Sequence, residues 1–216
     1  MIHQYIKQVS KFGTFIPSVS LEIGALDGSY SYTLQQTFKL AANDIYLVEP
    51  NPDLCGKLVE KFPYSHLFRN AVSDEESTLT LNRVASGDLD KLGCSSLRDR
   101  IDGWEKQLSY SPVEVQCIRG EALLEKIQRP VDLCIIDVEG CTYEVLRSFG
   151  NSLPMIRSLM LECEHAEIFK GQRLFDDVAT LLKHHNYRMM AFQYSYANQS
   201  DSIWIREEVL NVRYPG

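Results

Sequence analysis

The stretch LEIGALDGSYS, residues 21–31, decides the fold of this chain. An apolar strand pattern leads into a turn that contains two glycines, and a helix pattern follows the turn. A second apolar strand over residues 45–48 ends on Glu49, 21 residues after Gly28. This order is typical of the nucleoside-binding half of a doubly wound α/β sheet. Glycines there let the backbone approach the ligand, and the acid at the next strand end accepts hydrogen bonds from ribose hydroxyls.

The turn differs from a dinucleotide-binding turn, which usually reads G-x-G-x-x-G and lays a pyrophosphate against the helix N-terminus. Here the spacing is G-x-x-x-G, and Asp27 stands where the pyrophosphate would approach. Because a carboxylate beside a phosphate costs Coulomb energy, the turn favours a nucleoside without phosphates, such as S-adenosylmethionine. Glu22 and Asp27 would suit its methionyl ammonium. The alternative for Asp27, compatible with ligand contact, is that it caps the following helix.

The composition bounds the class of protein. The chain has 216 residues, 44% of them hydrophobic, a formal net charge of −7 and no basic run. We therefore expect one globular domain over residues 1–216, and neither nucleic acid nor a membrane surface as partner. No signal-peptide pattern or membrane-length apolar run occurs. Six cysteines without a CxxC pair favour reduced thiols and a cytoplasmic location.

Strand and helix patterns alternate through most of the chain, which predicts an α/β fold. Residues 1–18 carry Ile2, Tyr5, Ile6, Val9 and Phe12 at helical spacing, so a helical segment is expected before the sheet. Residues 85–112 are long for a loop and are predicted to form a lid or substrate-binding insertion. The predicted strands are 20–23, 45–48, 66–72, 131–137, 156–161, 188–194 and 202–206. The last two form a hairpin through the polar residues 198–201.

Four motifs in this order resemble the FkbM-type S-adenosylmethionine-dependent methyltransferases. They are EIGALDGSYS at 22–31, VEPNP at 48–52, NAVSD at 70–74 and IDVEG at 136–140, and the similarity spans residues 20–206. Family members commonly read D-V-G-A-N-x-G in the first motif, where this chain has Glu22, Leu26 and Asp27. The resemblance implies a Rossmann-like class I methyltransferase fold. Its seven-stranded sheet is mostly parallel and closes with an antiparallel C-terminal hairpin.

The resemblance also implies S-adenosylmethionine as the cofactor and O-methylation of a hydroxyl on a sugar or other small natural product. In such a fold the ligands lie beyond the carboxyl ends of the strands. The glycine turn would wrap the methionyl part, Glu49 would hold the ribose, and Ala71 with Val72 would flank adenine, whose amino group Asn70 or Asp74 would read. The expected cofactor-binding residues are Glu22, Gly24, Ala25, Asp27, Gly28, Ser31, Glu49, Pro50, Asn51, Asn70, Ala71, Val72 and Asp137.

Methyl transfer is an in-line displacement that depends on positioning and on a group that accepts the hydroxyl proton. Asp137 and Glu139 end a buried strand and share one face of it, so both are catalytic candidates. Alternatively, Asp137 caps the next helix, and Glu139 orients a loop or binds the methionyl end of the cofactor. His165, after the next strand, is a third candidate, favoured as a general base over a metal ligand because it has no paired histidine. No metal is expected.

The acceptor itself is not identified by the residues. Ser95, Ser96 and Glu164 are the predicted substrate-binding residues, and Trp104 with Tyr110 could stack on a sugar ring or pack onto the sheet. Two alternative functions stay open at this point. One is a nicotinamide-dependent oxidoreductase, which shares the ribose-binding acid but needs a third glycine. The other is a non-catalytic cofactor-binding module of the same fold.

Overall fold

The computed structural model describes residues 3, 5–6, 16–196 and 198–210. The N-terminal helix predicted over residues 1–18 falls mostly outside this part of the chain. His3, Tyr5 and Ile6 are helical, and Tyr5 is buried against the sheet, where its hydroxyl is 3.1 Å from Ser158 Oγ. The other residues of the predicted helical face, Ile2, Val9 and Phe12, lie outside the described residues.

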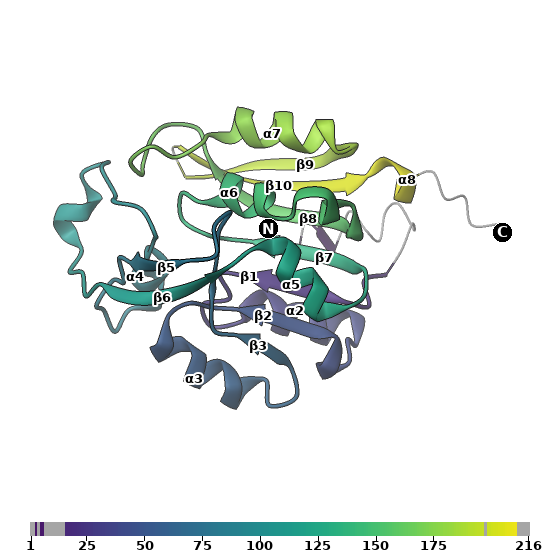
Figure 1. Ribbon diagram of the computed structural model, residues 1–216, viewed down its shortest axis with the longest axis horizontal. Helices are drawn as coiled ribbons and strands as arrows, with labels where there is room; N and C mark the ends of the chain where they lie inside the picture. The colour runs from purple at the N-terminus through teal and green to yellow at the C-terminus, as the bar shows by residue number, and fades with distance from the viewer. Residues whose placement is uncertain (1–2, 4, 7–15, 197, 211–216) are drawn as a thin grey trace.

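The main sheet has seven strands in the order β3-β2-β1-β7-β8-β10-β9 (Figure 1). Strands β1, β2, β3, β7 and β8 are parallel, whereas β10 runs antiparallel to both of its neighbours. The bounds are β1 Ser20–Ile23, β2 Ile45–Val48, β3 His66–Phe68, β7 Val131–Ile136, β8 Ile156–Glu164, β9 Tyr187–Tyr196 and β10 Gln199–Arg206. The predicted fold class, including the antiparallel C-terminal hairpin, is confirmed.

Two details of the sheets differ from the prediction. The strand predicted over residues 66–72 is divided: β3 pairs with β2, while β4 (Ala71–Val72) pairs with β6 (Val113–Ile118) in a second sheet that also holds β5 (Thr78–Leu81). In the hairpin, β10 begins at Gln199 rather than at residue 202. Asp201 therefore belongs to a strand and lies opposite Glu162 of β8 instead of in the hairpin turn.

Helices cover both faces of the main sheet, because side chains alternate between the two faces of each strand. Cys134 and Ile136 of β7 join the core formed with α5, α6 and α7, whereas Leu133 and Ile135 join the core formed with α2 and α3. The bounds are α2 Ser29–Phe38, α3 Pro52–Lys61, α4 Leu89–Gly93, α5 Gly120–Ile127, α6 Thr142–Ser148, α7 Phe175–His184 and α8 Glu207–Leu210. Three 3-10 helices are Ala42–Asp44, Trp104–Gln107 and Gly150–Met155. No helix within the described ranges has the length and apolar character that crossing a bilayer requires.

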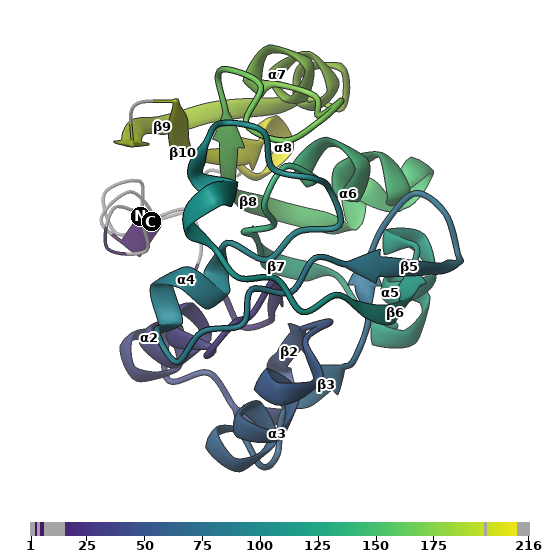
Figure 2. The ribbon, with the colours of Figure 1, turned by 90° about the vertical axis from the view of Figure 1, so that its left-hand side faces the viewer.

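Residues 85–112 lie over the carboxyl-end edge of the main sheet and carry α4 (Figure 2). Several contacts fix this segment to the rest of the chain, among them those of Ser96 and Arg100. Ser96 Oγ donates a hydrogen bond of 2.6 Å to the carbonyl of Glu139, and Arg100 pairs with Phe169 in a short antiparallel bridge. The segment is thereby positioned to form a wall of any site at this edge.

At the opposite edge, Asp132 connects β7 to the chain entering β1. Its Oδ2 accepts hydrogen bonds from Ser18 N at 2.8 Å, Ser18 Oγ at 2.7 Å and Val19 N at 3.1 Å. Its Oδ1 pairs with Arg157 at 2.8 Å, and the residue is only 3% exposed. A carboxylate with this many donors holds two central strands in register.

We expect Asp132→Ala to lower the free energy of unfolding by about 2–4 kcal/mol, because buried donors lose a charged acceptor. Urea denaturation monitored by circular dichroism measures this loss. Asp53→Ala, which removes a 73% exposed carboxylate paired with Arg83, is the control and should cost less than about 1 kcal/mol. Equal losses in the two variants would contradict the role given to Asp132.

Candidate active site

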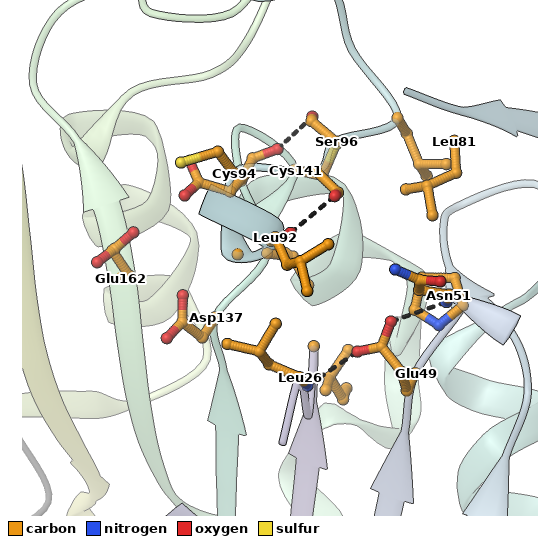
Figure 3. A pocket seen from close by; sticks show the side chains of 18 of the residues that line it. Leu26, Glu49, Asn51, Leu81, Leu92, Cys94, Ser96, Asp137, Cys141 and Glu162 are labelled. Carbon is orange, nitrogen blue, oxygen red and sulfur yellow. Dashed lines mark hydrogen bonds between the residues drawn. The ribbon is translucent and has the colours of Figure 1, made fainter. Parts of the chain in front are cut away.

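A cavity of about 1000 Å³ lies at the carboxyl ends of the parallel strands. Its walls come from the turn after β1, the end of β2, strand β4, residues 88–102, and the ends of β7, β8 and β10. Figure 3 shows Glu49 and Asn51 on one side of this cavity and Asp137 with Glu162 on the other. Residues from distant parts of the chain are therefore brought together where the fold class places its ligands.

Gly24 allows the two central turns to touch. Its φ of +80° is a backbone conformation that suits glycine, and its amide donates to the carbonyl of Val48 at 3.0 Å. A Cβ at this position would lie 2.0 Å from the carbonyl oxygen of Asp137. Any side chain here would force the turn after β1 away from the end of β7, so the glycine is required by this contact.

Glu49 is buried and held by two backbone amides. Its Oε2 accepts from Leu26 N at 2.9 Å and its Oε1 accepts from Asn51 N at 2.8 Å (Figure 3). Burial raises the pKa of Glu49 to about 7, and the two amide hydrogen bonds oppose that rise. Each carboxylate oxygen has a second acceptor position, so this locked group can also receive two neighbouring hydroxyls of a ligand.

Asn51 combines a structural role with a free donor. Its Oδ1 accepts from Asp53 N at 3.1 Å and caps α3, which explains why the helix begins at Pro52. The residue is 1% exposed and lines the cavity, yet its Nδ2 has no hydrogen-bond partner in the part of the chain that the structure describes. An unpartnered buried donor is costly unless a ligand supplies an acceptor.

The apolar side of the cavity includes Ala71 and Val72, as expected, together with Leu54 and Leu81. Asn70 also lines it and donates through Nδ2 to the Gln116 carbonyl at 3.3 Å. Asp74, the alternative to Asn70 for reading an adenine amino group, is not among the lining residues and forms an ion pair with Arg147. A flat apolar slot is thus available beside Glu49, with Asn70 at its rim.

Five predicted cofactor-binding residues support the site without lining it: Glu22, Ala25, Asp27, Gly28 and Ser31. Asp27 accepts the Ser29 amide at 3.0 Å and pairs with Lys61 at 3.3 Å, so its charge is neutralised at the protein surface. Because Asp27 is paired with Lys61 and does not line the cavity, the structure shows no contact through which it would repel a pyrophosphate. Asp27 lies one residue before Gly28, the N-cap of α2, so its hydrogen bond with Ser29 is a local turn contact at the start of the helix rather than a side-chain cap.

Glu22 of β1 holds the chain that follows the glycine turn. Its Oε2 accepts the amide of Ser31 at 2.9 Å, and the residue is 1% exposed. Burial, together with the charges of Asp137 and Asp27, raises its pKa from 4.5 to about 8, against the effect of the hydrogen bonds from Ser31. The first turn of α2 thus supplies the hydrogen-bond donor that the buried Glu22 requires.

Carboxyl groups line the side of the cavity away from Glu49. Asp137 and Glu139 follow β7, as the sequence predicts, whereas Glu162 lies near the end of β8 and Asp201 of β10 lies opposite it. Burial and mutual repulsion raise their pKa values, to about 6 for Asp137, about 8 for Glu139 and about 10 for Glu162. Asp201 was not predicted from the sequence, although the strand alternation around Ile203 and Ile205 could have revealed it.

Tyr30 is a second residue that the analysis missed. It lines the cavity from the first turn of α2, and its hydroxyl forms a hydrogen bond with Asp137 that lowers the pKa of that carboxyl. An aromatic residue two positions after Gly28 is the signal that could have indicated it. Asp137 is thereby held by one hydroxyl donor while it faces the cavity.

Of four other predicted residues, two line the cavity and two do not. Glu164 is 3% exposed, does not line the cavity and accepts the Gly140 amide at 3.0 Å. His165 also lies outside it, stacked on Phe175 and 2.7 Å from Ser200 Oγ. Ser95 and Ser96 do line the cavity, but each hydroxyl is bonded to backbone groups on both its donor and acceptor sides. The side chain of Trp104 lies outside what the structure describes.

The acids described by the structure are not grouped as a metal centre. No group of three or more His, Cys, Asp or Glu side chains within the described ranges is placed to hold a metal ion. Hard cations such as Mg²⁺ and Ca²⁺ need several oxygen ligands at short distance. The arrangement can instead accept hydrogen bonds and protons from organic ligands.

Solved structures with similar folds are methyltransferases or proteins of the Rossmann superfamily. The magnesium protoporphyrin IX methyltransferase of Synechocystis PCC 6803, solved with bound SAM, superimposes with a TM-score of 0.53 at 12% identity, covering 95% of this chain and 78% of that chain. A protein of the NADB-Rossmann superfamily from Streptococcus agalactiae has a TM-score of 0.51 at 10% identity, over 93% and 68%. These likenesses define the fold class.

Sequence comparison identifies the family. The model of the methyltransferase FkbM domain matches residues 22–189, so the chain belongs to the FkbM family of S-adenosylmethionine-dependent methyltransferases. The structure of methyltransferase FkbM from Methylobacillus flagellatus KT superimposes with a TM-score of 0.55 at 10% identity, over 88% of this chain but 43% of that chain. No curated protein sequence gives a significant match. The oxidoreductase alternative is thereby set aside.

The raised pKa of Glu22 predicts a pH-dependent stability. The folded state keeps the proton up to a pKa of about 8, against 4.5 as the ordinary value. The contribution of protonated Glu22 to the stability of the folded state is therefore complete below pH 4.5 and is lost as the pH rises through 8. Glu22→Gln mimics the protonated acid. We therefore expect this variant to retain about 1–3 kcal/mol of unfolding free energy that the wild type loses over this pH range.

Urea denaturation of the unliganded protein at a series of pH values between 5 and 8.5 measures this difference. Glu125→Gln, on the exposed side of α5, is the matched control and should follow the wild-type curve. Parallel curves for Glu22→Gln and the wild type would show that Glu22 is ionised in the folded protein.

Proposed function

We propose that this protein transfers the methyl group of S-adenosylmethionine to a hydroxyl of a sugar or other small natural product. The observation that carries the proposal is the row of carboxyl groups on the side of the cavity away from Glu49. Carboxylates accept hydrogen bonds from hydroxyls and can take up their protons, whereas no thiol or aromatic platform dominates this wall. The cavity is large enough for the cofactor together with a small acceptor.

The residues fit the cofactor in one orientation. Glu49 would accept hydrogen bonds from the two ribose hydroxyls, because its oxygens are already fixed by backbone amides. Adenine would lie against Ala71 and Val72 on the apolar side of the cavity. The unpartnered Nδ2 of Asn51 would supply a hydrogen-bond donor there. The methionyl part would pass Gly24 toward Asp137. Pro50 lines the cavity next to the ribose position.

When bound, the cofactor supplies an electrophilic methyl group on a positively charged sulfur. The protein then has to hold the acceptor hydroxyl in line and remove its proton. Asp137 is the proposed proton acceptor, because its pKa of about 6 leaves it ionised near neutral pH and Tyr30 orients it. Glu139 is proposed to position the acceptor. His165 is not assigned a catalytic role, since it does not line the cavity.

The substrate side of the cavity is proposed to be residues 85–112. Ser95 and Ser96 contribute to its wall while their hydroxyls hold the backbone, so they shape the site rather than bind through their side-chain oxygens. Glu164 is proposed to act indirectly, by fixing the Gly140 turn that presents Glu139. All six cysteines are free, which supports the proposed cytoplasmic location.

We expect S-adenosylhomocysteine to bind the wild type and to bind Gly24→Ala at least about tenfold more weakly, because the added Cβ displaces the end of β7. Isothermal titration calorimetry measures both affinities. Gly87→Ala is the matched control, since a Cβ there meets nothing within 4 Å and its φ is unstrained. Unchanged affinity in Gly24→Ala would place the cofactor elsewhere.

Transfer to oxygen is tested by incubating the protein with radiolabelled S-adenosylmethionine and a mixture of monosaccharides and their glycosides. We expect label in products that resist mild alkali, since methyl ethers survive it whereas methyl esters release methanol. Asp137→Asn should reduce this labelling at least about a hundredfold. Alkali-labile label would contradict a hydroxyl acceptor, and cofactor binding without any labelling would favour the alternative of a non-catalytic module.

A further inference from the structure

The charge lining the cavity is strongly one-sided. Of the described residues that line it, eight are acidic and two, Lys91 and Arg100, are basic. Arg100 is already engaged, because its Nε and Nη2 form two hydrogen bonds of 2.8 and 2.9 Å with Asp102. A cavity with this balance favours cations over anions, because a bound cation stabilises the ionised form of acids whose pKa is raised.

Glu139 differs from the other buried glutamates in lacking a donor. Glu22, Glu49 and Glu164 each accept at least one backbone amide. By contrast, Oε2 of Glu139 is fully buried and has no hydrogen-bond partner among the described residues, although the side chain lines the cavity. A buried carboxylate oxygen without a donor costs free energy that a ligand can recover.

Two further carboxyl groups face each other across neighbouring strands. Asp201 and Glu162 are directly opposite in the antiparallel register of β10 and β8, and both line the cavity. Like charges in this position repel. One fixed donor is present, the Gln199 amide, which is 3.0 Å from Glu162 Oε1. A positive charge between these groups and Glu139 would turn the repulsion into attraction.

The positive charge of the cofactor alone does not neutralise the acids on this side of the cavity. S-adenosylmethionine carries a sulfonium, an ammonium and a carboxylate, so it brings one net positive charge. In the proposed orientation its methionyl part lies beside Gly24 and Asp137, which meet at the base of the cavity. Glu139, Glu162 and Asp201 therefore remain for the second ligand.

We propose that the methyl acceptor is a cation, a hydroxyl compound that carries a protonated amine such as an amino sugar. The ammonium lies among Glu139, Glu162 and Asp201, and its three N–H donors satisfy the unpartnered Oε2 of Glu139. This inference rests on the proposed function, because it names the class of acceptor for the same cavity.

The test compares three ligands that share one pyranose frame: glucosamine, glucose and glucuronate. Each is titrated into protein saturated with S-adenosylhomocysteine at pH 7, and binding is followed by NMR or calorimetry. We expect glucosamine to bind at least about tenfold more tightly than glucose, because one charge-assisted contact is worth that factor, and glucuronate to bind most weakly. The preference should shrink as salt is added.

Glu139→Gln keeps the shape but cannot ionise beside a bound ammonium, and should reduce the preference for glucosamine at least about threefold. Glu125→Gln on the surface of α5 is the matched control and should keep the wild-type preference. Equal binding of glucosamine and glucose, tighter binding of glucuronate, or no binding of any of the three would overturn the inference. Titration of S-adenosylhomocysteine alone separates the outcomes, since its failure to bind the wild type would contradict the proposed function itself.

Discussion

The contact between Gly24 and the carbonyl of Asp137 is the constraint on which the site depends. It joins the turn after β1 to the end of β7, the two central strands of the sheet. Because no Cβ fits between them, the backbone of one turn lies directly against the other, and the cavity opens above this junction. Glu49 follows β2, the neighbour of β1, and Glu162 belongs to β8, the neighbour of β7. The two glutamates therefore lie on opposite walls of the cavity at fixed positions.

Buried carboxyl groups carry out two different tasks around this junction. Glu22, Glu49 and Glu164 are tied to backbone amides of the turns at Ser31, Leu26 and Gly140, so they stabilise the loops that form the site. Asp137, Glu139, Glu162 and Asp201 instead face the cavity. Burial raises the pKa of all four, and repulsion from neighbouring carboxylates adds to the rise for Asp137, Glu139 and Glu162. The first group is satisfied by the protein, whereas the second is left for ligands, which is typical of functional sites.

Local patterns were sufficient for most of the fold and for the central part of the site. Apolar alternation located the strands, and the acid at a strand end identified Glu49 and Asp137, because the carboxyl ends of parallel strands meet at one edge. Side-chain contacts between residues far apart in the sequence could not be predicted from these local patterns. Asp27 is paired with Lys61 and His165 is packed on Phe175, contacts that no spacing in the chain indicates. Asp201 joined the site only because β10 extends by three residues toward the hairpin turn.

The sequence by itself determined the family, the α/β class, the order of the motifs and the acids that end β2, β7 and β8, since these depend on residues close together in the chain. The tertiary structure alone decided which acids face the cavity and which hold backbone amides. That division depends on where neighbouring strands and turns place their donors, as with the Ser31 amide under Glu22 and the absent donor at Glu139. Hydrogen-bond partners contributed by distant segments exist only after the chain has folded.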